Sequence, residues 1–118
     1  MSDKMKRIDV IISQVKFEDL REALYEIGIT GMTVTKVLGS GMQKGRMEYI
    51  RGNITHTSLL HKLKVEIVVR DADMDAVIET VKKVLHTGES GDGKIFIYDV
   101  ANVIRISNGA EGIDALKY

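Results

Sequence analysis

Apolar residues along this chain recur with two different periods, and the order of these periods restricts the fold more than any other feature of the sequence. Residues 8–12 are apolar at every second position, which is typical of a half-buried strand. Leucine and isoleucine then recur at helical spacing through residues 17–27, and Gly28 follows where a helix C-terminus favours a residue with positive φ. Residues 31–38 are rich in β-branched side chains and predict a second strand.

The second half of the chain repeats this order. Residues 63–69 alternate as a strand does, and apolar residues at helical spacing predict a helix from Met74 to Leu85. Residues 95–100 predict a further strand, and we expect residues 103–106 to extend the sheet before a turn and a short tail. The resulting order is βαββαβ, the ferredoxin-like arrangement of an α+β sandwich.

The length of 118 residues corresponds to one domain, so we expect residues 1–118 to fold as a single unit. A domain of this size buries only about two-thirds of the surface of its unfolded chain, and association between copies would stabilise it. The 17 basic residues balance the 17 acidic ones, which argues against nucleic acid as a partner. No secretory signal and no membrane-spanning apolar run are evident, so we expect a cytoplasmic protein without direct membrane insertion.

In residues 39–58 the apolar side chains recur with neither the helical period nor the strand period. The segment is polar and contains glycines at several positions. Connections longer than about 12–15 residues without secondary structure are usually functional or disordered. We therefore expect this segment to be a functional loop.

Residues 88–94 combine three glycines with one lysine in the order Gly-Glu-Ser-Gly-Asp-Gly-Lys. A helix precedes this motif, a strand follows it, and Ile95 replaces the required Ser or Thr, so it is not a Walker A motif. Exposed amides in a glycine-rich turn still form a concave site for an anion such as phosphate. The alternative is an ordinary connection between a helix and a strand.

Other motifs in the chain are less specific. An aspartate series at the start of the second helix resembles a calcium loop, but Ala76 and Lys82 stand where glycine and a bidentate glutamate are required. We expect these aspartates to cap the helix: Asp71, Asp73 and Asp75. His56 and His61 lack further zinc ligands, and no base–nucleophile pair indicates catalysis, so we do not expect an enzyme.

Four blocks and the tail carry a resemblance to a known family. The blocks are Ile-Gly-Ile-Thr-Gly-Met-Thr-Val-Thr-Lys-Val at 27–37, Gln-Lys-Gly at 43–45, Thr-Gly-Glu-Ser-Gly-Asp-Gly-Lys-Ile-Phe at 87–96 and Val-Ile-Arg-Ile at 103–106, and the tail is 109–116. In these blocks the chain resembles the PII nitrogen-regulatory signal-transduction proteins, from about Met5 to Leu116 without an evident gap.

The resemblance implies a homotrimer of ferredoxin-like subunits that binds ATP or ADP as an effector in the clefts between subunits. Residues 39–58 would be the T-loop, the projecting element that such proteins insert into a partner, and residues 107–118 would be the C-terminal tail. The implied partner is a membrane transporter, such as an ammonium channel, or an enzyme of nitrogen metabolism. A slow nucleotidase using the same cleft and a protein that binds another small ligand are the alternatives.

Carried over position by position, the resemblance implies which residues bind nucleotide. The amides of residues 91–93 and the Lys94 ammonium would cradle the phosphates, and Arg105 would add a guanidinium. These groups would reach across the subunit interface to a pocket in which Glu66 accepts a hydrogen bond from adenine or ribose. The full implied set is Ile11, Thr33, Gly39, Gly41, Met42, Gln43, Glu66, Val68, Gly91, Gly93, Lys94, Arg105 and Ser107.

Two of these positions depart from the family. Met42 stands where relatives usually carry arginine, and Ser107 replaces the second arginine of an Arg-Ile-Arg sequence. A hydrogen bond to a charged group contributes about 1.5–3 kcal/mol. We therefore expect weaker triphosphate binding and a reduced preference for ATP over ADP.

The resemblance leaves a response to 2-oxoglutarate open. Gln43 would ligand an ATP-bound magnesium ion, and Lys62 would pair with a carboxylate of 2-oxoglutarate. Against this, residues 51–58 depart from the family. Thr55 and Asn53 also stand where relatives carry the tyrosine and serine that are covalently modified. We expect a sensor of nucleotide alone, with a 2-oxoglutarate-responsive nitrogen sensor of the usual PII type as the alternative.

Overall fold

The computed structural model describes residues 4–41, 48–50, 53–55, 58–89 and 92–116 of the chain. Its strands are β1 (Met5–Ile12), β2 (Thr33–Gly41), β3 (Glu48–Ile50), β4 (Asn53–Thr55), β5 (Ser58–Arg70) and β6 (Ile95–Val100). The α-helices are α1 (Phe17–Glu26) and α2 (Asp71–Leu85), and the short 3₁₀ turns are η1 (Gln14–Lys16) and η3 (Gly112–Ala115). Neither α-helix of the described part is both long and apolar enough to cross a membrane.

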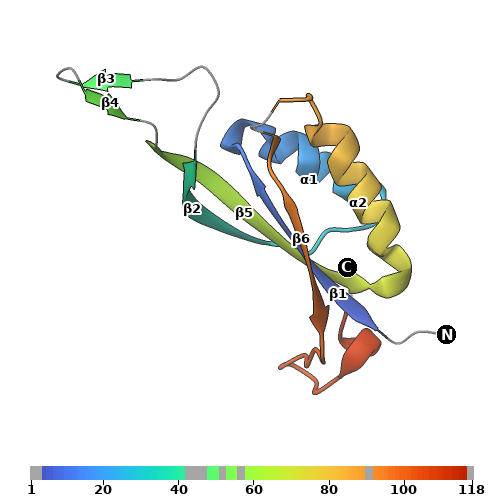
Figure 1. Cartoon of the computed structure of the whole chain (residues 1–118). Helices are drawn as coiled ribbons and strands as arrows, with labels where there is room; N and C mark the ends of the chain where they lie inside the picture. Colours follow the sequence, from blue (N-terminus) through green and yellow to red (C-terminus); the bar gives the residue numbers. More distant parts are fainter. Residues whose placement is uncertain (1–3, 42–47, 51–52, 56–57, 90–91, 117–118) are drawn as a thin grey trace.

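The four long strands form an antiparallel sheet in the order β2-β5-β1-β6 (Figure 1). Strand β1 pairs along its whole length with the second part of β5, from Met5 opposite Arg70 to Ile12 opposite Leu63. Strand β2 pairs with the other edge of β5, and β6 pairs with the other edge of β1. This topology confirms the ferredoxin-like α+β fold that the order of the elements predicts.

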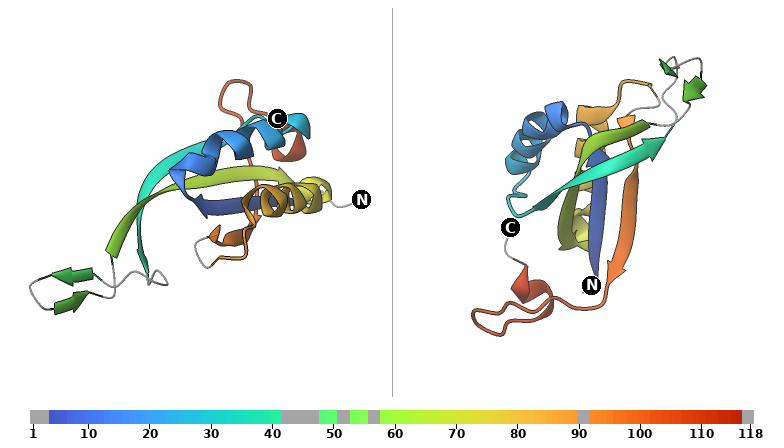
Figure 2. Two further views of the ribbon diagram at one scale, coloured as in Figure 1. Left: turned by 90° about the horizontal axis from the view of Figure 1, so that it is seen from above. Right: turned by 90° about the vertical axis from the view of Figure 1, so that its left-hand side faces the viewer.

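Both α-helices pack against one face of this sheet, which we call the inner face. Helices α1 and α2 lie side by side (Figure 2) and contribute Leu20, Leu24, Val77 and Val81 to a core in which each is at most 1% exposed. Alternate residues of the two central strands meet them: Ile8, Val10, Ile12, Leu63, Val65, Ile67 and Val69. The opposite face, which we call the outer face, is covered by neither α-helix of the described residues.

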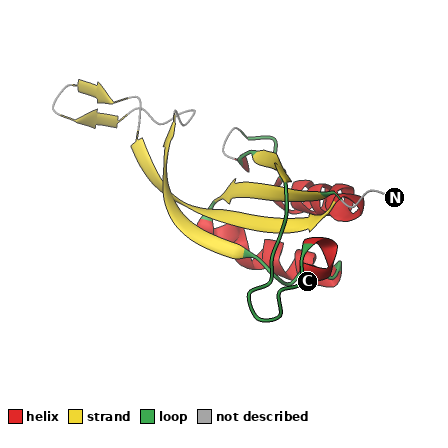
Figure 3. Cartoon of the chain, turned by 90° about the horizontal axis from the view of Figure 1, so that it is seen from below, coloured by secondary structure: helices red, strands yellow, loops and turns green. Residues whose placement is uncertain are grey.

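The described residues of the segment 39–58 contain strands that the sequence pattern did not predict. Strand β2 continues to Gly41, which lies opposite Ser58 at the start of β5. Strands β3 and β4 form a separate two-stranded ribbon away from the main sheet (Figure 3). Backbone pairing in a ladder does not require apolar side chains, which is why the missing period concealed these strands.

Residues 103–106 do not extend the sheet, which corrects the expected strand. Instead, the chain turns back on itself beyond β6, and only a single bridge joins Ile104 to Glu111. The Asn102 side-chain oxygen accepts hydrogen bonds from the amides of Val103 at 2.9 Å and Gly112 at 3.1 Å. These local bonds, with the Arg105 amide donating to the Ala110 carbonyl at 2.8 Å, satisfy backbone groups that a ladder would otherwise use.

The start of α2 carries two of the expected aspartates in its first turn, Asp71 and Asp73, where carboxylates favour the positive end of the helix dipole. The N-cap residue itself is Arg70, and its side chain makes no capping hydrogen bond. The Asp71 amide donates to the Lys4 carbonyl at 2.9 Å, and Asp73 pairs with the Arg70 guanidinium at 3.0 Å. The amide of Asp71, the first residue of α2, is therefore bonded to a backbone carbonyl of the segment before β1 and not to a side chain. Gly28, by contrast, has the predicted positive φ of 87°.

Candidate functional site

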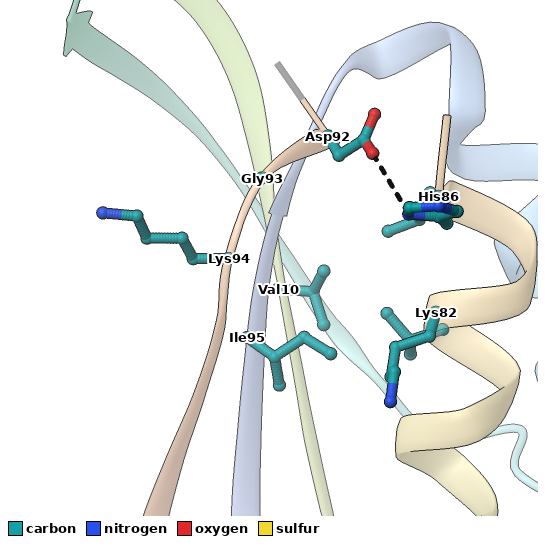
Figure 4. A pocket seen from close by; sticks show the side chains of 9 residues that line it. Val10, Lys82, His86, Asp92, Gly93, Lys94 and Ile95 are labelled. Carbon is teal, nitrogen blue, oxygen red and sulfur yellow. Dashed lines mark ion pairs between the residues drawn. The ribbon is translucent and has the colours of Figure 1, made fainter. Parts of the chain in front are cut away.

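The connection between α2 and β6 carries the glycine–lysine motif, and one carboxylate ties its described residues together. Asp92 accepts hydrogen bonds from the backbone amides of Thr87 at 2.8 Å and Gly88 at 3.0 Å, and from the Thr87 hydroxyl. These bonds, led by that of the Thr87 hydroxyl, lower the pKa of Asp92 below its ordinary value. His86 lies nearby, with Nδ1 3.7 Å from the carboxylate (Figure 4).

Gly93 follows this carboxylate and lies against strand β1. Its φ is +99°, and a Cβ at this position would lie under 3.0 Å from the Ile11 carbonyl oxygen. Both the backbone conformation and the space therefore require glycine here. The close approach places the Gly93 backbone beside Ile11, another residue of the implied nucleotide set.

The outer face of the sheet brings several predicted site residues onto one surface. Thr33 lies opposite Glu66, and Ile11 lies opposite Lys64, two residues before Glu66 on the same strand. Directly paired residues share a face, as do residues two apart on a strand. Val68, opposite Arg7, belongs to the same face.

This surface is divided between the two edges of the sheet. Thr33 is on edge strand β2, whereas Lys94 precedes the other edge strand, β6, and its side chain points away from α2 (Figure 4). Three strand spacings of about 4.8 Å separate these edges by roughly 14 Å. One chain therefore presents two separate groups of predicted site residues.

The base of the segment 39–58 holds a third group. Gly39 lies opposite Leu60, and a Cβ on it would be 3.6 Å from Cγ of Lys62. Gly41 is the last residue of β2. Glu66, further along β5, forms an ion pair with Lys64 at 3.2 Å. Its carboxylate is thus on the polar face, as expected, but already has a cationic neighbour.

Arg105 and Ser107 lie in the turned-back segment beyond β6, at the opposite end of that strand from Lys94 (Figure 1). Nη2 of Arg105 donates a hydrogen bond to the Ala115 carbonyl at 2.9 Å, and its Nε is buried without a hydrogen-bond partner. Within one chain, Arg105 is therefore not gathered with Lys94. Three residues of the implied set lie outside the described residues: Met42, Gln43 and Gly91.

The structure also shows polar contacts on the outer face that the sequence reasoning missed. Asp9 is 3% exposed and pairs with the Arg7 guanidinium, whose Nη2 donates to the carboxylate at 3.1 Å. The guanidinium also lies over the Tyr98 ring, 4.1 Å from its centroid. An aspartate among the apolar residues of a predicted strand was the available signal for this cluster.

Behind the glycine–lysine motif is a cavity of about 280 Å³. Its apolar floor is formed by Val10, Val81, Leu85 and Ile95, with polar groups from α2 and Asp92 at the rim (Figure 4). Among the residues that the structure describes, no group of three or more His, Cys, Asp or Glu side chains could hold a metal ion.

Comparison with known proteins identifies the family. Residues 5–110 match the family model "Nitrogen regulatory protein P-II". The chain is 53% identical over 107 residues to the nitrogen regulatory protein P-II of Klebsiella oxytoca, covering 91% of this chain and 96% of that protein.

Two solved structures extend this similarity to the fold. The GlnK–ATP complex of B. subtilis superposes with a TM-score of 0.82 at 40% identity, covering 98% of this chain and 99% of that one. Arabidopsis thaliana PII bound to citrate gives a TM-score of 0.77 at 33% identity, covering 96% and 92%. This chain belongs to the P-II family of nitrogen regulatory signal-transduction proteins.

Proposed function

We propose that this chain binds ATP or ADP between the subunits of a homotrimer and transmits the bound state to a partner through residues 39–58, the T-loop. The observation that carries this proposal is the division of the site residues between two edges of the sheet. Thr33 is on edge strand β2, with Glu66 opposite it on β5, whereas Lys94 immediately precedes the other edge strand, β6. A second copy that places one edge beside the other would complete a site that a single chain leaves in halves.

The outer face supports an assembly of this kind. Neither α1 nor α2, the two α-helices of the described part, covers it, and it exposes aromatic side chains: Phe96 is 42% and Tyr98 is 43% exposed. An antiparallel sheet with an uncovered face commonly meets solvent with polar residues, whereas aromatic groups favour contact with another protein surface. The B. subtilis relative of similar fold is a complex with ATP, which supports the choice of ligand.

The protein would recognise the nucleotide effector mainly by binding its phosphates. The Lys94 ammonium and the Gly93 backbone are the described groups suited to bind them. Met42 and Ser107 supply no guanidinium, so we propose that the preference for ATP over ADP is reduced. Magnesium ligated by Gln43, and 2-oxoglutarate paired with Lys62, belong to the alternative of a 2-oxoglutarate-responsive sensor.

The base of the T-loop offers apolar contacts for a partner. Leu38 is 56% exposed on β2, and Leu59 is 67% exposed on β5, where the strands extend beyond the helices. Such exposed apolar side chains are typical of protein docking sites. We propose a cytoplasmic regulator, without enzymatic activity, of a membrane transporter or an enzyme of nitrogen metabolism.

Titration calorimetry with ATP and ADP, each with and without magnesium and 2-oxoglutarate, tests the ligand directly. Gly93→Ala should weaken nucleotide binding about tenfold or more, because it forces the backbone away from Ile11. Gly28→Ala is the matched control, since Gly28 also has positive φ but a Cβ there would have no neighbour within 4 Å.

Light scattering checks that the protein is a trimer, and a phosphate-release assay checks for ATP turnover. The absence of nucleotide binding by the wild-type trimer would reject the proposed ligand. Steady ATP hydrolysis would favour a slow nucleotidase instead. A magnesium-dependent response to 2-oxoglutarate would favour the alternative of a 2-oxoglutarate-responsive sensor of the usual PII type.

A further inference from the structure

Asp92 and the groups that it binds form a closed arrangement, which we call the Asp92 clasp. Its members are the Asp92 carboxylate, the amides of Thr87 and Gly88, and the Thr87 hydroxyl. The hydroxyl also accepts a hydrogen bond from the Glu89 amide at 3.2 Å, and the Asp92 amide donates to the Glu89 carbonyl at 3.2 Å. Backbone and side-chain bonds thus join the beginning of this connection to its end.

The clasp lies on one side of the chain and the groups suited to phosphate lie on the other. The Asp92 side chain turns toward the end of α2, whereas the Lys94 side chain extends away from that helix (Figure 4). Between them, Gly93 is held against the Ile11 carbonyl. The backbone that carries Lys94 is therefore restrained by the clasp before it and by the contact with β1.

Electrostatics restricts what Asp92 can do here. A bare carboxylate beside a phosphate site would repel the ligand, so direct contact with phosphate is unfavourable. Its oxygens instead accept three hydrogen bonds from the protein itself, and these stabilise the ionised form. Hydrogen bonds within the connection stabilise the negative charge of Asp92, and the side chain points away from Lys94.

We infer that Asp92 is a positioning residue for the phosphate groups of an adenine nucleotide. It ties the residues after α2 to the residue before Gly93, and so presents the Gly93 backbone and the Lys94 ammonium together on the side facing the ligand. This inference rests on the proposed function, because it assigns a role within the same site. It predicts that the clasp governs the contribution of the phosphates to binding and leaves the contribution of the adenosine part unchanged.

The main experiment compares Asp92→Asn with wild type in binding to ADP and to adenosine. The asparagine oxygen can still accept from the two amides, and its NH₂ group can donate to the Thr87 hydroxyl, so the variant keeps the shape of the side chain and removes the negative charge that strengthens these bonds. We expect ADP affinity to fall about tenfold, the equivalent of one charge-assisted hydrogen bond. Adenosine affinity, measured by NMR titration, should stay within about twofold of wild type.

Two further comparisons separate positioning from general damage. Thr87→Val removes the hydroxyl and should lose ADP affinity as Asp92→Asn does, whereas Thr87→Ser keeps the hydroxyl and should restore it. Asp99→Asn makes the same chemical change on β6, where the carboxylate pairs with Lys6, and should leave ADP binding unchanged. Hydrogen exchange should show faster exchange at the Thr87 and Gly88 amides in Asp92→Asn.

The outcomes distinguish this inference from the function on which it rests. If the wild-type trimer binds neither ADP nor ATP, the proposed function is wrong. If the wild type binds ADP and both Asp92→Asn and Thr87→Val bind it equally well, the clasp has no positioning role. An equal loss of ADP and adenosine affinity in the folded variants would also overturn the inference. Should Asp92→Asn fail to fold, the Thr87 pair of variants decides.

Discussion

The two faces of the four-stranded sheet are built from alternate residues of the same strands, yet they differ in almost every physical property. On the inner face, Ile8 and Val65 are fully buried and Ile67 is 1% exposed. On the outer face, their neighbours include the Lys64–Glu66 ion pair and the pair of the partly exposed Arg7 with the buried Asp9. Because successive side chains of a strand point in opposite directions, one strand can contribute to the core and to the candidate site at once.

This difference separates folding from function along the sequence. Burial of the inner face under α1 and α2 stabilises the fold by removing apolar surface from water. The outer face contains the polar groups and the exposed aromatics, and nearly all described residues of the candidate site lie on it or at its margins. Substitutions on the two faces should therefore have different consequences, even when they are adjacent in sequence.

The largest effect should come from the inner face. Ile67→Ala removes a side chain that is 1% exposed and should lower the free energy of unfolding by about 2–5 kcal/mol. The next residue, Val68, lies on the outer face and is only partly buried, so Val68→Ala should cost about 1 kcal/mol or less. Chemical denaturation at one fixed protein concentration measures both. An equal or larger cost at Val68 would show that the outer face is as much a core as the inner one.

A smaller effect is expected from the Arg7–Asp9 pair of the outer face, in which only the carboxylate is buried. Arg7→Met leaves the carboxylate of Asp9, 3% exposed, without its guanidinium and should cost about 1–3 kcal/mol. Arg21→Met is the control, because its pair with Glu18 is exposed at both ends and should contribute about 0.2–1 kcal/mol.

A double-mutant cycle with Asp9→Asn sharpens this second prediction. Without the carboxylate, loss of Arg7 should cost less, since no buried charge is left unpaired. Strict additivity of the two single variants would mean that the Arg7–Asp9 pair contributes nothing beyond its separate parts.

The smallest effect should be the loss of folding stability at low pH that two aspartates cause. The pKa of Asp92 is lowered mainly by the Thr87 hydroxyl, and that of Asp99 mainly by the Lys6 ammonium. A lowered pKa in the folded state means that the stabilisation is present above the ordinary aspartate pKa and is lost as the pH falls through the folded value. Both groups lie at the margins of the sheet, not in its core, so the loss should be modest.

Unfolding measured at several pH values below 4 checks this, because Asp92→Asn and Asp99→Asn should each reduce the acid dependence of stability. Unaltered pH profiles in both variants would show that these carboxylates are equally stabilised in the unfolded chain.

Several features of the fold and the site were predictable from single residues. Gly28 has the positive φ that its position after a helix indicates, and Glu66 lies on the polar face of its strand. These predictions were confirmed because they depend only on the local backbone conformation and on the alternation of side chains along a strand. The predicted strand at residues 103–106 is wrong because the Asn102 side-chain oxygen accepts hydrogen bonds from the amides of Val103 and Gly112 and turns the chain back, a local competitor that β-propensity does not include.

The sequence by itself determined the order of the elements and which residues of each are apolar, since helices and strands place side chains with fixed periods. Only the tertiary structure decided the sheet order β2-β5-β1-β6, in which every neighbour is distant in sequence. That order separates Thr33 from Lys94 at opposite edges, brings Gly93 against Ile11, and leaves Arg105 bound to the Ala115 carbonyl. Contacts of this kind depend on where whole elements pack, and a period along one chain contains no information about them.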